Sequence, residues 1–437
     1  MDQSRHIILN LNMIPGGVYA SAWRTGYRPA HSFASIEHFK ELAEIAERGK
    51  LDALFLADGG YWSLKAEYQA YRHLDPVIVL TYLAALTSKI GLIVTASSSY
   101  NTPYNLARRI LSLDHVSGGR AGWNIVVTAG DDAARNFSLD SALPKEERYK
   151  RATEFLEIVT ALWRSWAPDA LLADADSGRF VDGSKVHPIN YNGEHFRVDG
   201  PMVTLPSTQG APVIVQAGGS EAGTDLAARF CHVVYSTQPS YDGARAFRTE
   251  LKKRAQDQGR NPDAIKLVPG LMTIVGANEK EARDRSDYLL SLIPQQVAIA
   301  ELSARSLVPE QLLLDHLDKE LPWDIIPESL LSGAGHGGSI LRQAHEERLT
   351  VRQLAKRNSS VEMHATAVGS AEQVADKIQH WFETGAVDGF NIMPAELPKG
   401  ASEFVDHVVP ILQDRGIFRR DYEKKTLRGH YGLQTED

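Results

Sequence analysis

Cysteine is almost absent from this 437-residue sequence, because Cys231 is its one thiol. A single cysteine excludes both an intramolecular disulfide and a cysteine-based zinc cluster, and it is typical of a reducing compartment. The sequence also lacks an excess of positive charge, since 47 Lys and Arg residues stand against 55 Asp and Glu residues, for a formal net charge of −8. This acidic balance argues against a nucleic-acid-binding protein, which would need a basic surface.

Long hydrophobic runs are missing as well. The longest apolar stretch lies at residues 77–86, far short of the roughly 20 residues that span a membrane. The N-terminus, MDQSRHIILNLNM, lacks the basic start and the long apolar centre of a secretory signal. We therefore expect a cytoplasmic protein that associates neither with membranes nor with nucleic acids.

Several familiar functional motifs are absent. The sequence contains no Walker A loop, no H-E-x-x-H zinc motif and no G-x-S-x-G nucleophile elbow. The glycine-rich tract at 332–338 follows a helical pattern rather than a strand, which argues against a dinucleotide-binding fingerprint. The 15 histidines show no metal-ligand spacing, so the sequence predicts no metal site.

The sequence does contain a regular alternation of short apolar runs with amphipathic stretches. The apolar runs carry little polar alternation, as expected for strands that are covered on both faces. Strands are expected at 6–13, 53–58, 90–97, 122–128, 211–218, 232–238, 265–276 and 388–394. Helices are expected between them, at 35–48, 76–88, 103–116, 148–166, 220–231, 241–258, 371–384 and 401–415. About eight β–α units in one series favour a (β/α)8 TIM-like barrel over an open doubly wound sheet.

Two of the expected helices have recognisable N-terminal signals. Ser35 precedes an amphipathic stretch and is expected to be its N-cap. Ser370 and Gln373 have the spacing of a capping box, which predicts that a helix opens at residue 371.

Two stretches interrupt the barrel pattern, although residues 1–437 are expected to form a single domain. Residues 167–210 are polar and rich in turns, with a hairpin arm at 195–200, and residues 295–365 have the pattern of a large helical insertion. Long insertions after barrel strands build the mouth of an active site or a lid. A polar arm at 419–437 follows the last helix, and it either crosses to a neighbouring subunit or packs on its own barrel.

Small, polar or flexible residues follow the ends of several expected strands, where barrel enzymes place their chemistry. These residues suit hydrogen bonds to a polar ligand better than covalent catalysis, and the sequence identifies no catalytic base or nucleophile. Taken one at a time, each also fits a loop residue or a helix cap. The residues are Asp58, Thr95, Ser97, Thr128, Gly218, Gly219 and Ser220.

The segment QAGGSEAG, residues 216–223, is the most informative local pattern. Its central glycines let the backbone approach a ligand closely, and Ser220 opens a helix whose free N–H groups attract an anion. This arrangement predicts a phosphate site, with a glycine turn capped by serine as the alternative. Tyr149, which follows Lys145 and Arg148 at the start of another helix, would add a hydroxyl and positive charge to the same phosphate. Core packing is the alternative role of Tyr149.

A series of longer stretches matches one known family, in order from one end of the chain to the other. The stretches are AWR (22–24), ERGKLDALFLAD (47–58), TPYNLARRILSLDHVSGGRAGWNIVVT (102–128), AARNF (133–137), ERYKRATEFLEIVTALW (147–163), SKVHPINYNGEHFRVDGP (184–201), PVIVQAGGSEAG (212–223), GSAEQVADKIQHWFETGAVDGFNIM (369–393) and DYEKKTLR (421–428). With them the chain resembles the flavin-dependent monooxygenases of the bacterial-luciferase-like superfamily. More narrowly, it looks like the branch of nitrilotriacetate, EDTA, dibenzothiophene-sulfone and long-chain alkane monooxygenases.

The resemblance implies a TIM-like barrel with insertions that uses FMN as FMNH2, delivered by a separate NAD(P)H-dependent flavin reductase. Reduced flavin would react with O2 to give a C4a-(hydro)peroxyflavin that oxygenates a small organic substrate. Tyr149 and Ser220 would then hold the phosphate, while the strand-end residues would line the isoalloxazine or ribityl side. The positions that match the family's flavin contacts are Asp58, Thr95, Thr128, Tyr149, Gly218, Gly219 and Ser220.

The chain departs from the family pattern in three places, one of which is the stretch AGDD (129–132) after Thr128, which is not the commonest version. Lys145 stands where the family often has a histidine, and a lysine can reach a phosphate but cannot act as a neutral imidazole. The loop after the first strand reads PGGVYASAW (15–23), with glycine and tyrosine where some relatives have histidines. We therefore expect a substrate pocket that differs in shape and proton chemistry. The candidate pocket residues are Tyr19, Trp23, Tyr61, Trp62 and His364.

These features leave three functions open. The first is a two-component FMN-dependent monooxygenase that acts on a small organic substrate. The second is a deazaflavin- or flavin-dependent oxidoreductase that transfers hydride without O2, and the third is a non-catalytic flavin-binding subunit. Because members of the family are dimers or tetramers, the resemblance also implies a homodimer or a homotetramer.

Overall fold

The computed structural model describes residues 6–62, 65–70, 74–331, 336–361 and 364–435. The first part of the glycine-rich tract predicted at 332–338 lies outside these residues. No helix in the described ranges is long and apolar enough to cross a membrane.

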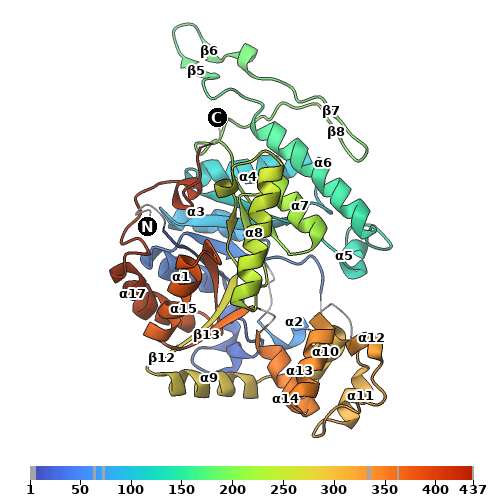
Figure 1. Cartoon of the computed structure of the whole chain (residues 1–437). Coiled ribbons are helices and arrows are strands. Elements are labelled where there is room, and N and C mark those ends of the chain that lie inside the picture. Colours follow the sequence, from blue (N-terminus) through green and yellow to red (C-terminus); the bar gives the residue numbers. More distant parts are fainter. Residues whose placement is uncertain (1–5, 63–64, 71–73, 332–335, 362–363, 436–437) are drawn as a thin grey trace.

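Eight parallel strand positions form a closed barrel (Figure 1). β11 pairs with β10 while β12 pairs with β14, and only Val268 and Pro269 separate β11 from β12, so this interrupted strand closes the ring. β13 (Ala365–Ser370) is an additional parallel strand beside β12. The TIM-like barrel predicted from the sequence is thereby confirmed. The barrel strands are β1 (Ile8–Asn12), β2 (Ala53–Leu56), β3 (Gly91–Ser97), β4 (Ala121–Val126), β9 (Val213–Ala217), β10 (Val233–Tyr235), β11 (Lys266–Leu267) with β12 (Gly270–Gly276), and β14 (Gly389–Pro394).

Prolines account for two differences between the expected and the observed elements. The strand expected at 265–276 is interrupted at Pro269, which has no N–H to donate to a neighbouring strand. The helix expected at 401–415 consists of α16 (Lys399–Glu403), a π-helical turn (Phe404–Val408) and α17 (Val409–Asp414). Pro410 cannot donate the hydrogen bond that would continue a regular α-helix through this segment, which places the π turn just before it.

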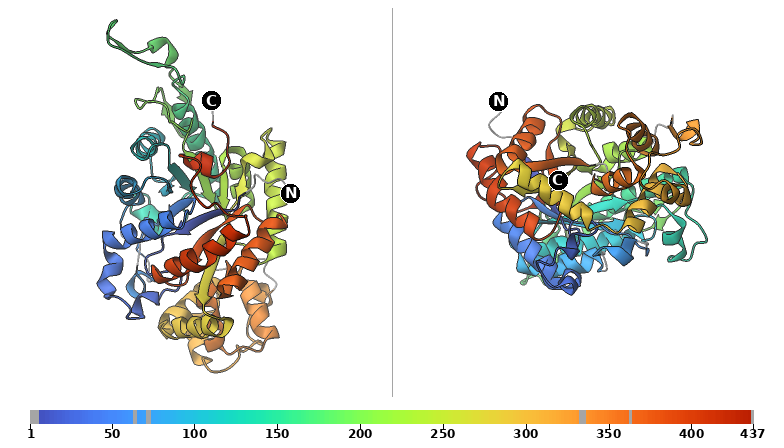
Figure 2. Two further views of the ribbon diagram at one scale, coloured as in Figure 1. Left: turned by 90° about the vertical axis from the view of Figure 1, so that its left-hand side faces the viewer. Right: turned by 90° about the horizontal axis from the view of Figure 1, so that it is seen from below.

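Helices cover the outside of the barrel, as the view from below shows (Figure 2). Both predicted caps are confirmed, because the Ser35 side chain accepts a hydrogen bond from the backbone N–H of Glu37, and Ser370 forms a capping box with Gln373. Short helices occupy the loops, namely α2 (Lys65–Tyr68) and α5 (Asp131–Arg135). The covering helices include α1 (Ile36–Arg48), α3 (Pro76–Leu86), α4 (Pro103–Ser117), α6 (Lys145–Trp163), α7 (Glu221–Phe230), α8 (Tyr241–Asp257) and α15 (Ala371–Glu383).

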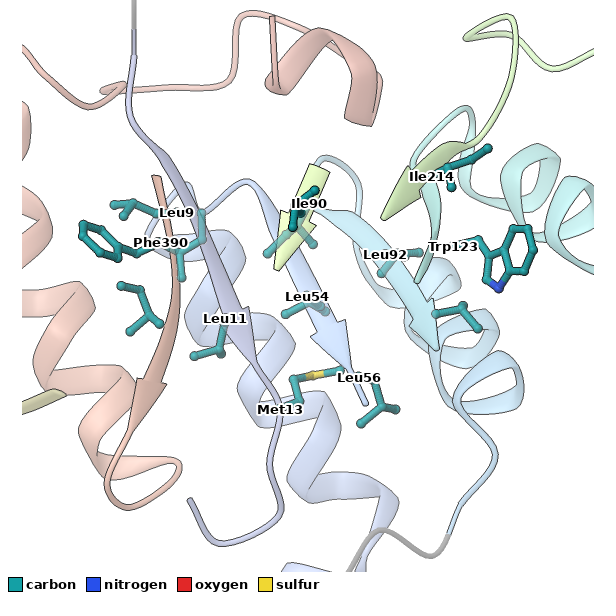
Figure 3. Packing of buried hydrophobic residues seen from close by; sticks show 14 of the residues in the cluster. Leu9, Leu11, Met13, Leu54, Leu56, Ile90, Leu92, Trp123, Ile214 and Phe390 are labelled. Atoms are coloured by element: carbon teal, nitrogen blue, oxygen red, sulfur yellow. The ribbon is translucent and has the colours of Figure 1, made fainter. Parts of the chain in front are cut away.

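Side chains of the barrel strands alternate between two apolar layers, because successive residues of a strand point to opposite faces. Leu9, Leu54 and Leu92 belong to the layer between the strands and the helices (Figure 3). Their neighbours Ile8 and Ile93 belong to a second cluster, which fills the inside of the barrel. Each fully buried aliphatic side chain contributes about 1.5–3 kcal/mol to folding, so the two layers together fix which strand residues face the interior.

The two insertions lie at opposite ends of the molecule (Figures 1 and 2). Residues 167–210 follow the end of α6 rather than a strand, and their hairpin, β5 (Leu171–Asp174) with β6 (Arg179–Val181), projects away from the barrel. This position differs from the active-site mouth expected for a long insertion. The hairpin arm expected at 195–200 pairs β7 (Tyr191–Asn192) with β8 (Arg197–Val198).

The second insertion, residues 295–365, follows α9 (Glu279–Ser291), the helix after β12, and it is helical, with an apolar cluster of its own. It lies beside α9 at the end of the molecule opposite to the β5–β6 hairpin (Figure 1). Its position after a barrel strand is the one from which a lid over the mouth could form. The helices of the insertion are α10 (Gln295–Ser306), α11 (Glu310–Asp315), α12 (Glu328–Leu331), α13 (His336–Glu346) and α14 (Val351–Val361).

The C-terminal arm closes the amino-terminal end of its own barrel. Leu427, the first residue of α18 (Leu427–His430), and Tyr431 belong to the cluster inside the barrel. The Tyr431 hydroxyl donates a hydrogen bond to Asn10 Oδ1 at 2.9 Å, and Arg428 Nε donates to the carbonyl oxygen of Ala211 at 2.9 Å. Of the two alternatives for this arm, the structure shows packing on its own barrel.

Candidate active site

The predicted strand-end residues meet at the carboxyl ends of β2, β3 and β4. Thr95 and Asn124 are register partners on β3 and β4, and the Asn124 side chain donates a hydrogen bond to Thr95 Oγ1 at 3.0 Å. Ser97 and Thr128 share a second hydrogen bond, with 2.7 Å between their hydroxyl oxygens. Asp58 is exposed two residues after β2. These side chains offer a row of donors and acceptors to a ligand that lies across the strand ends.

One buried polar atom in this row has no hydrogen-bond partner among the described residues. Asn124 Oδ1 is buried without a partner, whereas its amide nitrogen is bound to Thr95. Leaving a buried acceptor unsatisfied costs about 1–3 kcal/mol. A polar ligand at the strand ends would provide the missing donor. Asn124 is therefore a site residue that the sequence analysis missed, because it lies inside β4, two residues before the strand ends.

The phosphate site predicted at 216–223 is built around the start of α7. Ser220 is the N-cap, and its Oγ accepts a hydrogen bond from the Gly223 N–H at 3.3 Å. Tyr149 reaches the same point from α6, with 3.3 Å between its hydroxyl oxygen and Ser220 Oγ. A Cβ on Gly223 would lie 3.2 Å from Tyr149 Oη, so glycine keeps this cradle open. The structure thus brings together two residues that are 71 positions apart in the sequence.

The donors of this cradle suit a phosphate. Gly218 and Gly219 are exposed, and Gly218 has a φ of 141°, a conformation that favours glycine. Gln216 Oε1 is buried without a partner among the described residues, whereas its amide nitrogen donates to the carbonyl oxygen of Ala217 at 3.1 Å. Free N–H groups at a helix start, together with two hydroxyls, are the usual receptor for a phosphate dianion. The residues present therefore fit the phosphate end of FMN.

Lys145 and Arg148 have different environments on the first turns of α6. Lys145 is the first residue of the helix and is exposed. Arg148 is engaged with the backbone, because its guanidinium donates to the carbonyl oxygens of Leu143 at 2.9 Å and Thr128 at 3.3 Å. Arg148 therefore joins the end of β4 to the start of α6, and Lys145 is the side chain that remains suited to reach a phosphate.

The predicted substrate-pocket residues lie in four different environments. Tyr19 is 2% exposed, its hydroxyl lies 3.1 Å from Ser286 Oγ on α9, and burial raises its pKa. Trp23 donates from its indole N–H to the carbonyl oxygen of Tyr68 at 2.9 Å. Tyr61 and Trp62 follow β2 and are exposed, whereas His364 is buried next to β13. The five residues thus differ in their exposure and in their hydrogen-bond partners.

The position of Tyr19 follows from the way in which its loop is held. The backbone N–H groups of Val18 and Tyr19 donate to the carbonyl oxygens of Pro394 and Ala395, each at 3.1 Å. A Cβ on Gly17, whose φ is 113°, would lie 2.4 Å from the carbonyl oxygen of Ala395. The loop after β1 is therefore hydrogen-bonded to the end of β14 and the residue that follows it, and this contact directs the Tyr19 side chain towards α9.

Two further groups contain side chains that the sequence analysis did not identify, although His364 in the first group is one of its candidates. Tyr235, the last residue of β10, lies 3.2 Å from both His364 Nε2 and Met393 Sδ, and the strand-end rule could have identified it. Tyr100 and Phe137 stack at 4.5 Å between ring centroids, next to the loop after β2. Both groups surround the carboxyl ends of the strands, where a substrate would meet the cofactor.

The absence of a metal site is a prediction that the structure leaves open. Among the described residues, one group of three potential ligands occurs, formed by Glu147, Glu194 and His195. It joins the β7–β8 turn to the first turn of α6, and 3.5 Å separate His195 Nε2 from Glu147 Oε1. Its geometry is that of a salt bridge once the imidazole is protonated.

Comparisons with known proteins agree with this geometry. A family model described as luciferase-like monooxygenase matches residues 14–388. N-acetyl-S-(2-succino)cysteine monooxygenase of Bacillus subtilis (strain 168) is 40% identical over 432 residues, which cover 99% of this chain and 98% of that protein. Nitrilotriacetate monooxygenase component A of Aminobacter aminovorans is 39% identical over 435 residues, covering 95% and 94% of the two chains.

A solved structure extends the likeness to three dimensions. The EDTA monooxygenase from Chelativorans sp. BNC1 superposes with a TM-score of 0.82 at 34% identity, and the match covers 99% of this chain and all of that one. Sequence and fold thus agree over nearly the whole length of each protein. The chain therefore belongs to the luciferase-like monooxygenases, a family of flavin-dependent enzymes built on a TIM-like barrel.

Proposed function

We propose that the chain is the oxygenase of a two-component system, which receives FMNH2 from a separate NAD(P)H-dependent flavin reductase and uses O2 to oxygenate a small organic substrate. The observation that carries this proposal is the cradle at the start of α7, where Ser220, Tyr149 and Gly223 converge on the carboxyl end of a barrel of this family. The word component in the name of the nitrilotriacetate relative supports a separate partner protein.

In this proposal each candidate residue has one task. Tyr149 and Ser220 donate hydrogen bonds to the phosphate, and Lys145 adds a positive charge. The exposed glycines Gly218 and Gly219 let the phosphate approach the backbone. Asp58, Thr95 and Thr128 line the ribityl chain and the flavin ring. When bound, the flavin supplies the reaction with O2, and the protein binds, orients and excludes water.

The substrates of the relatives indicate a chemical class. N-acetyl-S-(2-succino)cysteine, nitrilotriacetate and EDTA name small acids whose carboxylate-bearing arms are attached to sulfur or nitrogen. We infer that this chain acts on an acid of the same class. The branch that the sequence resembles also includes enzymes for an aromatic sulfone and for alkanes, so these compounds belong in the test.

Oxygen consumption tests the proposed activity. The protein is mixed with enzymatically reduced FMN and, in turn, with the three acids, dibenzothiophene sulfone or a long-chain alkane. The expected result is substrate-dependent consumption of O2, with one atom of 18O from labelled O2 in the product. Product formation without O2 would favour hydride transfer instead. Tight binding of FMNH2 with no product from any compound would favour a non-catalytic flavin-binding subunit.

Ser220→Ala should weaken FMN binding, because it removes a hydroxyl that donates to the phosphate. The expected loss is about 1–3 kcal/mol, or roughly 5- to 150-fold in the dissociation constant. Fluorescence titration with FMN measures it. Ser240→Ala is the matched control, because Ser240 caps α8 through the same contact with a glycine N–H three residues later. An equal dissociation constant for the two variants would remove Ser220 from the phosphate site.

We also propose that the chain forms a homodimer or a homotetramer. The helix α3 supports this, because it is apolar on both faces. Val79, Leu80 and Leu83 pack against the barrel, whereas Ile78, 68% exposed, and Tyr82 lie one turn apart on the outer face. A helix that is hydrophobic all round is normally covered on both sides. Light scattering of the purified protein measures the number of subunits.

A further inference from the structure

Three distant elements bring polar and sulfur-containing side chains together inside the barrel. Tyr235 ends β10, Met393 belongs to β14, and His364 immediately precedes the additional strand β13. The Tyr235 hydroxyl oxygen lies 3.2 Å from His364 Nε2 and 3.2 Å from Met393 Sδ. The Tyr235 ring also contacts Phe55 of β2, with 5.3 Å between the ring centroids. The cluster therefore spans the interior from β10 to the strands on the other side.

A glycine in β12 makes room for this cluster. A Cβ on Gly270 would lie 2.4 Å from His364 Nδ1 and 2.6 Å from Met393 Sδ. Glycine weakens a buried strand, and such a position often marks a close approach of another group. Here the group that approaches is the imidazole of His364, which is 6% exposed. Because Gly270 has no side chain, the imidazole of His364 fits between β12 and Tyr235.

The cluster occupies the part of the barrel mouth that the proposed flavin contacts leave open. Those contacts come from the ends of β2, β3, β4 and β9, together with α6 and α7. Tyr235, Met393 and His364 come from β10, β14 and the start of β13. Tyr235 is partly exposed although it ends a buried strand, so its side chain reaches from the interior towards the mouth.

The chemistry of the cluster fits an oxygen acceptor on a ligand. A phenol has one proton to donate, and a thioether sulfur such as that of Met393 is a weak acceptor for it. A carboxylate oxygen is a far stronger acceptor, and a charged acceptor roughly doubles the strength of a hydrogen bond. A carboxylate that leaves water also needs a positive partner, and the neighbouring imidazole of His364 can carry that charge.

We propose that Tyr235 is a substrate-binding residue whose hydroxyl donates a hydrogen bond to a carboxylate oxygen of the substrate. His364 is the positioning residue that orients this hydroxyl, and Gly270 provides the space for His364. This inference rests on the proposed function, since it assigns the binding partner of an acid substrate. It assigns to the acid the side of the mouth that β10, β14 and the start of β13 form.

Tyr235→Phe tests the hydrogen bond without removing the ring. With N-acetyl-S-(2-succino)cysteine, nitrilotriacetate and EDTA as probes, the KM of whichever acid is oxygenated should rise about 10-fold. The value of kcat should change less, and the dissociation constant of FMN should stay that of the wild type. Tyr241→Phe is the matched control, because Tyr241 also pairs with a histidine, His380, on the outside of the barrel. An unchanged KM for Tyr235→Phe would overturn the proposal.

A double-mutant cycle tests the role of His364. Gly270→Ala should displace the imidazole and raise KM as Tyr235→Phe does, although Tyr235 and His364 are both retained. His364→Ala should raise KM as well, and the double variant should cost less than the sum of the two substitutions, because the added methyl group then meets Met393 Sδ but no imidazole. Strictly additive effects of the two substitutions would contradict the coupling.

A spectroscopic measurement separates this inference from the proposed activity. The full chain is prepared with 3-fluorotyrosine at position 235 or, as a control, at position 241, and each acid is titrated while 19F NMR spectra are recorded. The resonance at 235 should shift and the resonance at 241 should not. This result would hold even if no acid were oxygenated, which would refute the proposed function alone. If the resonance at 235 does not shift with any of the three acids, the inference is overturned, whether or not an acid is oxygenated.

Discussion

Leu427→Ala should lower the free energy of unfolding by about 3–5 kcal/mol, because it empties a site in a packed interior. Leu427 is completely buried in the cluster inside the barrel. Its methyl groups lie against two strands that carry glycine at the point of contact, Gly91 on β3 and Gly122 on β4. The surrounding backbone belongs to the barrel and cannot collapse into the cavity. Denaturant unfolding followed by circular dichroism measures the change.

Two further variants show whether the loss comes from this contact. Leu172→Ala is the control, since Leu172 is about as large but lies exposed in the projecting β5–β6 hairpin, and its effect should stay within about 0.5 kcal/mol. Gly91→Ala should also destabilise, because its Cβ would lie 2.4 Å from Leu427 Cδ1. Combining Gly91→Ala with Leu427→Ala should cost less than the sum of the two. A loss below about 1 kcal/mol for Leu427→Ala would mean that the arm does not seal the barrel.

Asp388→Asn should cost about 3–5 kcal/mol, because it leaves a largely buried cation without its partner. Asp388 precedes β14 and is 4% exposed. Arg248 of α8 donates to both carboxylate oxygens, at 2.8 and 3.0 Å, and the Leu267 N–H donates to one of them at 2.9 Å. The carboxylate thus holds α8 and β11 to the strand that completes the ring. Asp376→Asn is the control, because Asp376 pairs with Arg415 at the surface, where such pairs contribute little.

The same carboxylate predicts how stability depends on pH. Burial alone would raise the pKa of Asp388, but the hydrogen bonds and charge of Arg248 outweigh it and hold the pKa at about 2. Since the ordinary pKa is 3.8, the unfolded chain takes up this proton first as the pH falls. The stabilisation is therefore complete above pH 3.8 and is lost between there and pH 2, by about 2 kcal/mol.

Comparing the wild type with Asp388→Asn separates the effect of the Asp388 titration on stability from titrations that change stability in the opposite direction. Burial raises the pKa of Asp52 and Asp114, so these groups favour the folded state at low pH rather than at high pH. Both remain in Asp388→Asn. The difference in unfolding free energy between wild type and variant should therefore be largest at neutral pH and should shrink as the pH falls towards 2. A constant difference over this range would contradict the role of the carboxylate.

The sequence predicts the barrel and the local structure at the start of α7 well, because both depend on residues that follow one another in the chain. A strand, a pair of glycines, a capping serine and a helix follow one another between Val213 and Phe230, and each has a local signal. The caps at Ser35 and Ser370 are likewise local. Chain order then determines the rest, since parallel strands that alternate with helices bring their carboxyl ends to one rim.

The contacts on the substrate side cannot be predicted in this way, although the sequence identifies Tyr19 and His364 as candidate pocket residues. Tyr235, Gly270, His364 and Met393 come from four separate segments, and their contacts exist only once the ring has closed and β13 has joined it. The orientation of Tyr19 also cannot be predicted from its neighbours in the sequence. Its loop belongs to the carboxyl end of β1, but the direction of its side chain depends on hydrogen bonds to the loop after β14, nearly 400 residues away. The contacts of Tyr235 and of Tyr19 thus depend on how distant segments come together, rather than on the local propensity of each segment.

The packing of the C-terminal arm inside the barrel has a consequence for folding during synthesis on the ribosome. Leu427 and Tyr431 follow every barrel strand in the chain, so a ribosome releases them after all the strands have left the exit tunnel. Until then the interior beside Gly91 and Gly122 lacks the apolar side chain of Leu427 at the amino-terminal end of the barrel. The apolar cluster inside the barrel can therefore be completed only after this arm has been synthesised.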